Sequence, residues 1–149
     1  MHSSPKTELP GSSSPEAARL VASARDCLKL AYAPYSNFHV AAAVLDEQGR
    51  VFTGVNVENA SYGLTMCAER VAIFSAIAAG ARTIAAVAVT AKGIQNVTPC
   101  GACRQVMAEF CSATTPIYCD NESLEPVRWT FGELLPQAFG RTQLETVRK

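Results

Sequence analysis

Two short segments contain residues whose types and spacing could do metal chemistry. One reads LTMCAER and places Cys67 and Glu69 two positions apart at the start of an apolar stretch. Cysteine packs readily in a core, but an unpaired carboxylate is costly there because its charged form must leave water. The other reads PCGAC, and its C-x-x-C at a helix start would put Cys100 and Cys103 on one face of the first turn, where thiolates are stabilised. Both segments are candidates for a reactive site.

Taken one at a time, these residues have ordinary explanations. Cys67 could be a small core residue, Glu69 could face solvent, and the C-x-x-C pair could be metal ligands, a redox dithiol or core residues. Taken together, three thiolates from two helix N-termini leave one position of a tetrahedral zinc ion open for a water whose pKa the metal lowers to about 7. The pattern therefore predicts a catalytic Zn²⁺ held by Cys67, Cys100 and Cys103. Glu69, beside the metal without binding it, is the predicted proton carrier.

Charge balance adds a prediction for the next residue. Three thiolates around one zinc ion carry net negative charge, which would oppose ionisation of a bound water. Arg70 follows Glu69 directly, and we expect it to donate a hydrogen bond to a ligand sulfur and moderate that charge. For Arg104 this role and an ordinary surface position are equal alternatives. The other cysteines, Cys27, Cys111 and Cys119, fall in apolar contexts and are assigned to packing.

The elements that must position these residues follow from periodicity and capping signals. A helix should begin near Ser13 or Ser14, with Ser13 and Glu16 as a capping box, and should end before Pro34. Gly80 should follow the C-terminus of the helix that contains Glu69. The first half of the chain should form strands within 38–57 joined at Gln48-Gly49, a loop over 56–65 and a helix from Thr65 or Met66 to Ala79. A strand over 83–91 in parallel pairing should follow, and then a helix from Cys100 to Cys111. The last expected elements are a strand over 115–119 and a short helix within 130–135 capped by Thr130 and Glu133.

The totals set the class of protein. The chain of 149 residues is long enough for one domain with a core. We expect residues 1–13, rich in Ser, Pro and Gly, to be a disordered tail, and residues 14–149 to form a single three-layer α/β domain, α-β-α, with a mixed sheet. Thirteen basic residues balance 13 acidic ones, so nucleic acid and anionic membranes are not expected partners. The sequence contains no run of about twenty apolar residues and no apolar signal segment, which favours a soluble, cytoplasmic protein.

The motifs resemble a known family. C-A-E followed by P-C-x-x-C is similar to the signature of zinc-dependent nucleobase deaminases. YSNFHV, NVENASYGLTMCAER, TPCGACRQVMAEF and ELLPQAFG together resemble the short, homotetrameric class of cytidine deaminase over roughly residues 15 to 140. Ala41 departs from the family, which commonly has glycine there.

The resemblance implies roles for further residues. Asn56 and Glu58 would hydrogen-bond the ribose hydroxyls of a nucleoside, and the backbone N–H of Ala68 would meet the pyrimidine carbonyl. Phe38 would pack against the nucleoside. Residues matching Tyr62 and Phe139 would complete the pocket from neighbouring subunits, which would make a homotetramer with shared active sites.

The residue chemistry and the family resemblance lead to the same expected function. It is the hydrolytic deamination of cytidine and 2′-deoxycytidine to uridine and 2′-deoxyuridine with release of ammonia, a step of pyrimidine salvage. A deaminase of another aminopyrimidine, such as blasticidin S, shares the metal motifs and is an alternative. A non-catalytic zinc-stabilised binding module would explain the cysteines but not Glu69 or the NVEN loop. A polynucleotide deaminase is disfavoured because the chain lacks the basic surface that binding phosphates requires.

Overall fold

A computed structural model describes residues 14–121 and 125–148. The predicted tail over residues 1–13, including Ser13 of the predicted capping box, lies outside the described residues. The helices are α1 (Pro15–Cys27), the 3-10 helices η1 (Leu28–Leu30) and η2 (Tyr62–Leu64), α2 (Ala68–Ala78), α3 (Gly101–Phe110), α4 (Phe131–Leu134) and α5 (Arg141–Glu145). The strands are β1 (Val40–Asp46), β2 (Val51–Val55), β3 (Ile84–Ala91), β4 (Pro116–Cys119) and β5 (Val127–Thr130).

The strands form one mixed sheet in the order β2-β1-β3-β4-β5. β1 pairs antiparallel with both β2 and β3, β3 pairs parallel with β4, and β4 pairs antiparallel with β5. The parallel pairing expected for residues 83–91 is therefore right for one neighbour of β3 and wrong for the other. The strand is apolar on both faces because helices cover both faces of the sheet, which does not depend on the direction of pairing.

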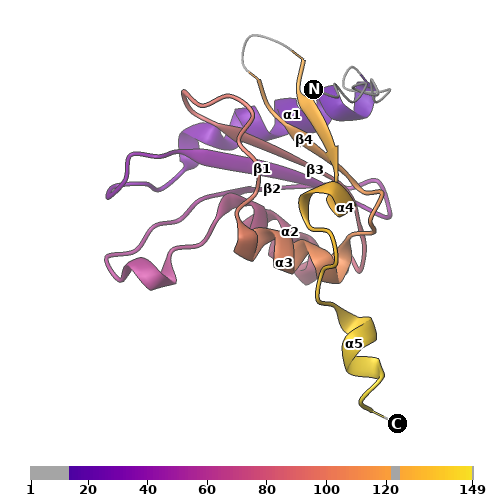
Figure 1. Ribbon diagram of the computed structural model, residues 1–149. Coiled ribbons are helices and arrows are strands. Elements are labelled where there is room, and N and C mark those ends of the chain that lie inside the picture. Colours follow the sequence, from indigo (N-terminus) through magenta and orange to yellow (C-terminus); the bar gives the residue numbers. More distant parts are fainter. Residues whose placement is uncertain (1–13, 122–124, 149) are drawn as a thin grey trace, which may run out of the picture.

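Helices cover the two faces of the sheet, with α1 on one side and α2 and α3 on the other (Figure 1). Side chains alternate along the strands. In β1, Val40, Ala42 and Val44 belong to the core under α2 and α3, whereas Ala43 and Leu45 belong to the core under α1. This arrangement confirms the predicted three-layer α/β fold with a mixed sheet.

Helix boundaries differ from the expected ones by a few residues. Ser14 is the N-cap of α1, where its hydroxyl accepts a hydrogen bond from the N–H of Ala17. α2 begins at Ala68, two or three residues later than expected, and Gly80 follows it with φ of +100°, as a C-terminal glycine does. None of the helices in ranges 14–121 and 125–148 has the length and apolar character needed to cross a bilayer.

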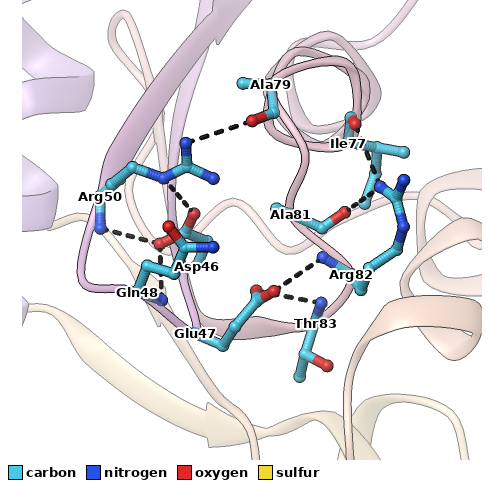
Figure 2. A network of polar contacts seen from close by, with 9 residues as sticks. All are labelled: Asp46, Glu47, Gln48, Arg50, Ile77, Ala79, Ala81, Arg82 and Thr83. Atoms are coloured by element: carbon cyan, nitrogen blue, oxygen red, sulfur yellow. Dashed lines mark hydrogen bonds and ion pairs between the residues drawn. The ribbon is translucent and has the colours of Figure 1, made fainter.

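The β1–β2 turn is attached to the far end of α2 (Figure 2). The carboxylate of Asp46, which is buried, accepts hydrogen bonds from the backbone N–H and the Nε of Arg50 at 2.8 and 2.7 Å. Arg50 Nη1 then donates to the carbonyl oxygen of Ala79 at 3.2 Å. Glu47 accepts from the backbone N–H groups of residues 82 and 83, at 3.0 and 3.1 Å. These contacts hold the C-terminal end of α2 against the sheet.

α1 is attached to the end of β4 by a buried carboxylate. Arg25 donates two hydrogen bonds to Asp120, at 2.7 and 2.6 Å, and the hydroxyl of Thr90 donates a third at 2.8 Å. Burial alone would raise the pKa of Asp120, but the hydrogen bonds from Arg25 and Thr90 and the charge of Arg25 outweigh it and lower the pKa. The pair therefore contributes stability above the unfolded pKa of about 3.9 and loses it as pH falls through the lower folded pKa.

Arg25→Ala should lower the free energy of unfolding at pH 7 by about 2 kcal/mol, because it leaves a buried carboxylate without its cation. We take a value below that of a fully buried pair because the Arg25 side chain is 48% exposed. The measurement is urea unfolding from pH 7 to pH 3, with Arg19→Ala on the exposed face of α1 as control. The difference from wild type should shrink toward pH 3. Equal stability of the Arg25→Ala and Arg19→Ala variants at pH 7 would contradict this prediction.

Candidate active site and metal centre

Helix α2 lies directly on strand β2, and a glycine allows the close approach. A Cβ atom added to Gly54 would lie 2.4 Å from the backbone nitrogen of Ala72 and 2.5 Å from the carbonyl oxygen of Ala68. Side chains do not approach backbone atoms so closely, so glycine is required at this crossing. The contact holds the first turns of α2, and with them Cys67 and Glu69, against the sheet.

The three cysteines singled out above meet where α2 and α3 begin. Cys67 and Cys100 are the N-cap residues of the two helices, and Cys103 lies in the first turn of α3. Their Sγ atoms all lie within 4.8 Å of one another, and those of Cys67 and Cys100 are 3.8 Å apart. Two sulfurs bound to one tetrahedral zinc ion, each at about 2.3 Å, would also be about 3.8 Å apart. The donor types and their spacing fit Zn²⁺.

The thiols influence one another's ionisation. Hydrogen bonding with Cys103 and Arg70 outweighs burial and lowers the pKa of Cys67 to about 5. The same pairing with Cys67, together with burial, raises the pKa of Cys103. Without a cation, one thiolate therefore suppresses ionisation of its neighbour. A divalent cation among the sulfurs would remove this conflict and favour thiolates throughout.

Glu69 lies beside the sulfur cluster in the first turn of α2. Its Oε2 is 3.8 Å from Cys103 Sγ, and the residue is only 5% exposed. Burial raises the pKa of its carboxyl group. Glu69 also lines a cavity, so a small molecule in that cavity would meet the carboxylate. The carboxyl group in this apolar helix thus lies beside both the sulfur cluster and the cavity.

Arg70 also contacts the sulfur cluster. Its Nη2 donates a hydrogen bond to Cys67 Sγ at 3.3 Å, and this contact raises the pKa of the guanidinium. Arg70 Nε is buried and has no hydrogen-bond partner within the part of the chain that is described. The guanidinium places positive charge beside the sulfurs.

Arg104 is not an ordinary surface arginine. Its Nε donates to the carbonyl oxygen of Pro99 at 2.7 Å, and its Nη2 donates to the hydroxyl of Thr98 at 3.2 Å. Its Nη1 donates to the carbonyl oxygen of Leu134 at 2.7 Å. Arg104 therefore binds the loop that leads into Cys100 and joins it to the end of α4, without contacting a sulfur in any of these bonds.

A cavity of about 340 Å³ adjoins the sulfur cluster. A second cavity, of about 330 Å³, borders the first. The first is lined by Ser36, Phe38, Val40, Asn56, Glu58, Thr65, Cys67, Ala68, Glu69, Val97, Thr98 and Cys100. The second shares Ser36, Glu58 and Thr65 and adds Tyr35 and Tyr62. Together they offer room for a small organic molecule, with polar groups at one end and the cysteines at the other.

Asn56 and Ala68 both line the larger cavity. The side-chain amide of the buried Asn56 donates to the carbonyl oxygen of Phe38 at 2.7 Å and accepts from the N–H of Val40 at 2.9 Å. These bonds fix Phe38 at the cavity wall. Ala68 is the first residue of α2, and the N–H of a first helical residue has no acceptor within its own helix.

Tyr62 and Phe139 lie in different places. Tyr62 is 75% exposed and makes an edge-to-face contact with Tyr35, with ring centroids 5.8 Å apart. Phe139 is 57% exposed and lines neither of the two cavities, and its carbonyl oxygen accepts a hydrogen bond from Gln105 Nε2 at 2.9 Å. Within one chain, the structure thus brings Tyr62 to the site and leaves Phe139 outside it.

Sequence reasoning missed several residues of the cavity wall. Val97 and Thr98 directly precede the P-C-x-x-C motif, and Ser36 stands in the quoted YSNFHV segment, yet none was given a role. Their positions beside motif residues were the available signal. Their side chains alone suggest no chemistry.

Comparison with known proteins decides the family. Residues 15–119 match the family described as the cytidine and deoxycytidylate deaminase zinc-binding region. The chain belongs to this family. The cytidine deaminase of Sporosarcina psychrophila is 44% identical over 126 residues, covering 85% of this chain and 93% of that protein. That of Halalkalibacterium halodurans is 54% identical over 109 residues, covering 73% of this chain and 83% of the relative.

A solved structure agrees with this membership of the cytidine and deoxycytidylate deaminase family. The crystal structure of cytidine deaminase from Burkholderia pseudomallei has a TM-score of 0.77 and 48% identity, and the match covers 82% of this chain and 98% of that one. The family, the zinc-dependent class of deaminase and the fold predicted from the sequence are therefore confirmed.

Proposed function

We propose that this chain catalyses the hydrolytic deamination of cytidine and 2′-deoxycytidine to uridine and 2′-deoxyuridine with release of ammonia. The observation that carries the proposal is the cluster of three Sγ atoms within 4.8 Å of one another, at two helix N-termini. Glu69 lies beside that cluster and lines a cavity of about 340 Å³. Relatives named cytidine deaminase, 44% and 54% identical to this chain, support the choice of substrate.

In this proposal Cys67, Cys100 and Cys103 hold the zinc ion. When bound, zinc acts as a Lewis acid that lowers the pKa of a coordinated water to about 7. Glu69 accepts a proton from the attacking water and passes it to ring N3, and later carries the remaining proton of that oxygen to the departing amine, which leaves as ammonia. Its burial keeps bulk water from competing for those protons.

The cavity wall supplies the contacts to the nucleoside. Asn56 and the carboxylate of Glu58, which can only accept, hydrogen-bond the ribose hydroxyls, and the backbone N–H of Ala68 donates to the pyrimidine carbonyl. Phe38, whose backbone carbonyl is held by the side chain of Asn56, packs against the nucleoside. The roles rest on the family resemblance and are supported by the position of all four residues on one cavity.

We also propose a homotetramer in which Tyr62 and Phe139 complete the pockets of neighbouring subunits, Tyr62 while it also borders the cavity of its own chain. The high exposure of both side chains, 75% and 57%, supports this. A monomer by light scattering would contradict it. The role in pyrimidine salvage and the cytoplasmic location stay predictions.

Replacing Arg70 with glutamine should weaken zinc retention or lower kcat by about 10- to 100-fold, because the thiolate of Cys67 would lose its cationic donor. Zinc release to a chromophoric chelator and kcat on cytidine are the measurements. Arg19→Gln, on the exposed face of α1, is the control. Unchanged zinc release and kcat in the Arg70 variant would contradict this role.

One experiment tests the proposed function against its competitors. Purified protein is incubated with cytidine, 2′-deoxycytidine, cytosine, CMP and blasticidin S, and ammonia release is followed with and without a zinc chelator. We expect release from the first two only, abolished by the chelator. Release from blasticidin S alone would identify the alternative enzyme, and release from none would identify a binding module.

A further inference from the structure

The hydroxyl of Ser36 joins two residues of the cavity wall. It donates a short hydrogen bond to Glu58 Oε2 and accepts one from the backbone N–H of Phe38 at 3.0 Å. Asn37, between Ser36 and Phe38, has φ of +56°, so the chain turns tightly here. One hydroxyl therefore joins the carboxylate of Glu58 to the backbone of Phe38, and both residues line the same cavity.

The two oxygens of Glu58 are used differently. Oε1 accepts hydrogen bonds from the backbone N–H groups of Tyr35 at 2.9 Å and Ser36 at 3.1 Å, which occupies both of its lone-pair directions. Oε2 accepts only the Ser36 hydroxyl among the described residues, so one acceptor direction remains. Because Glu58 lines both cavities, that direction is available to a bound molecule.

The same contacts keep Glu58 an acceptor. The Ser36 hydroxyl, followed by the backbone N–H groups of Ser36 and Tyr35, outweighs burial and lowers the pKa of Glu58. An ionised carboxylate offers no proton, so the ligand group that it binds must be a donor. A sugar hydroxyl is such a donor, whereas a phosphate, which is anionic, would be repelled.

We propose that Ser36 is a positioning residue that aims Glu58 Oε2 at the 3′-hydroxyl of the bound nucleoside. This inference rests on the proposed function, in which cytidine and 2′-deoxycytidine are both substrates. The 2′-hydroxyl is absent from one of them, so a ring hydroxyl that serves both must be the 3′-hydroxyl. With Oε1 fixed by the backbone, removal of the Ser36 hydroxyl would free Oε2 to rotate away.

The test compares 2′-deoxycytidine with 2′,3′-dideoxycytidine, which differ only in the 3′-hydroxyl. In wild type, kcat/KM should be higher for 2′-deoxycytidine. Ser36→Ala should reduce that preference about tenfold, mainly through KM, because a hydrogen bond to a charged group is misaligned. Ser36→Thr, which keeps the hydroxyl, should retain the wild-type preference for 2′-deoxycytidine. Ser23→Ala on α1, whose hydroxyl donates only to its own helix, is the matched control.

A double-mutant cycle shows whether Ser36 acts through Glu58. Glu58→Ala should remove the preference for the 3′-hydroxyl, and Ser36→Ala combined with Glu58→Ala should behave as Glu58→Ala alone. Thermal melting and zinc content of each variant confirm that the fold and metal centre persist.

The outcomes separate the two proposals. If Ser36→Ala keeps the wild-type preference, or loses activity equally on both nucleosides, the hydroxyl serves only the loop and this inference is wrong while the proposed function stands. If wild type shows no preference for the 3′-hydroxyl, the inference is also wrong. If wild type releases no ammonia from cytidine, the proposed function itself fails.

Discussion

Replacing Glu69 with glutamine should leave zinc bound and lower kcat on cytidine by about 10²- to 10⁴-fold. The amide keeps the size and hydrogen-bonding shape of the carboxylate but can neither accept nor deliver a proton, and proton transfer by a positioned group contributes about that factor. Glu69 is 5% exposed, so a neutral side chain is also easier to bury, and the melting temperature should not fall.

Three measurements make this result specific: zinc per chain by atomic absorption, kcat, and the melting temperature. Glu109→Gln on α3 is the matched control, because Glu109 makes an exposed ion pair with Arg141 at 3.0 Å and should tolerate the change. Wild-type turnover by the Glu69 variant would defeat its assignment as the proton carrier. Loss of zinc from it would mean that Glu69 acts on the metal centre instead.

Replacing Cys103 with alanine should abolish zinc binding and lower kcat by at least about a thousandfold, because the metal supplies several kcal/mol of transition-state stabilisation. Binding of zinc to the folded state alone also adds stability. A strong chelator should therefore lower the melting temperature of wild type while leaving that of the Cys103 variant unchanged.

Cys111→Ala is the control for the loss of a cysteine. Cys111 follows α3 directly, and burial raises the pKa of its thiol to about 12, which disfavours the thiolate that a metal requires. This variant should keep one zinc per chain and wild-type kcat. A Cys103 variant with full zinc content, or the same chelator response in both variants, would rule out Cys103 as a ligand.

Local patterns were sufficient for much of the fold. The helix starts around Cys67 and Cys100, the glycine after α2, and the capping box of Thr130 and Glu133 were all readable, since each depends on residues within one turn of one another. β5 was missed because four residues, VRWT, are too few to show alternation. α5 was missed as well, and its five residues bury nothing.

Contacts between distant segments could not be predicted. Arg25 and Asp120 are 95 positions apart, and no local signal connects them. The tight crossing of α2 over Gly54 and the three hydrogen bonds of Arg104 depend on how two elements pack, which the spacing of residues within one element does not encode.

The sequence by itself determined the chemical types at the site: three thiolate donors at two helix starts, and a carboxylate two residues from one of them. These follow from spacing along the chain, because a helix turn converts spacing into a shared face. Only the tertiary structure decided that Cys67 lies 3.8 Å from Cys100 and that the Ser36 hydroxyl holds Glu58. Sulfurs 33 positions apart, and a hydroxyl and carboxylate 22 apart, meet only after burial of the apolar faces has brought α2, α3 and the loops together.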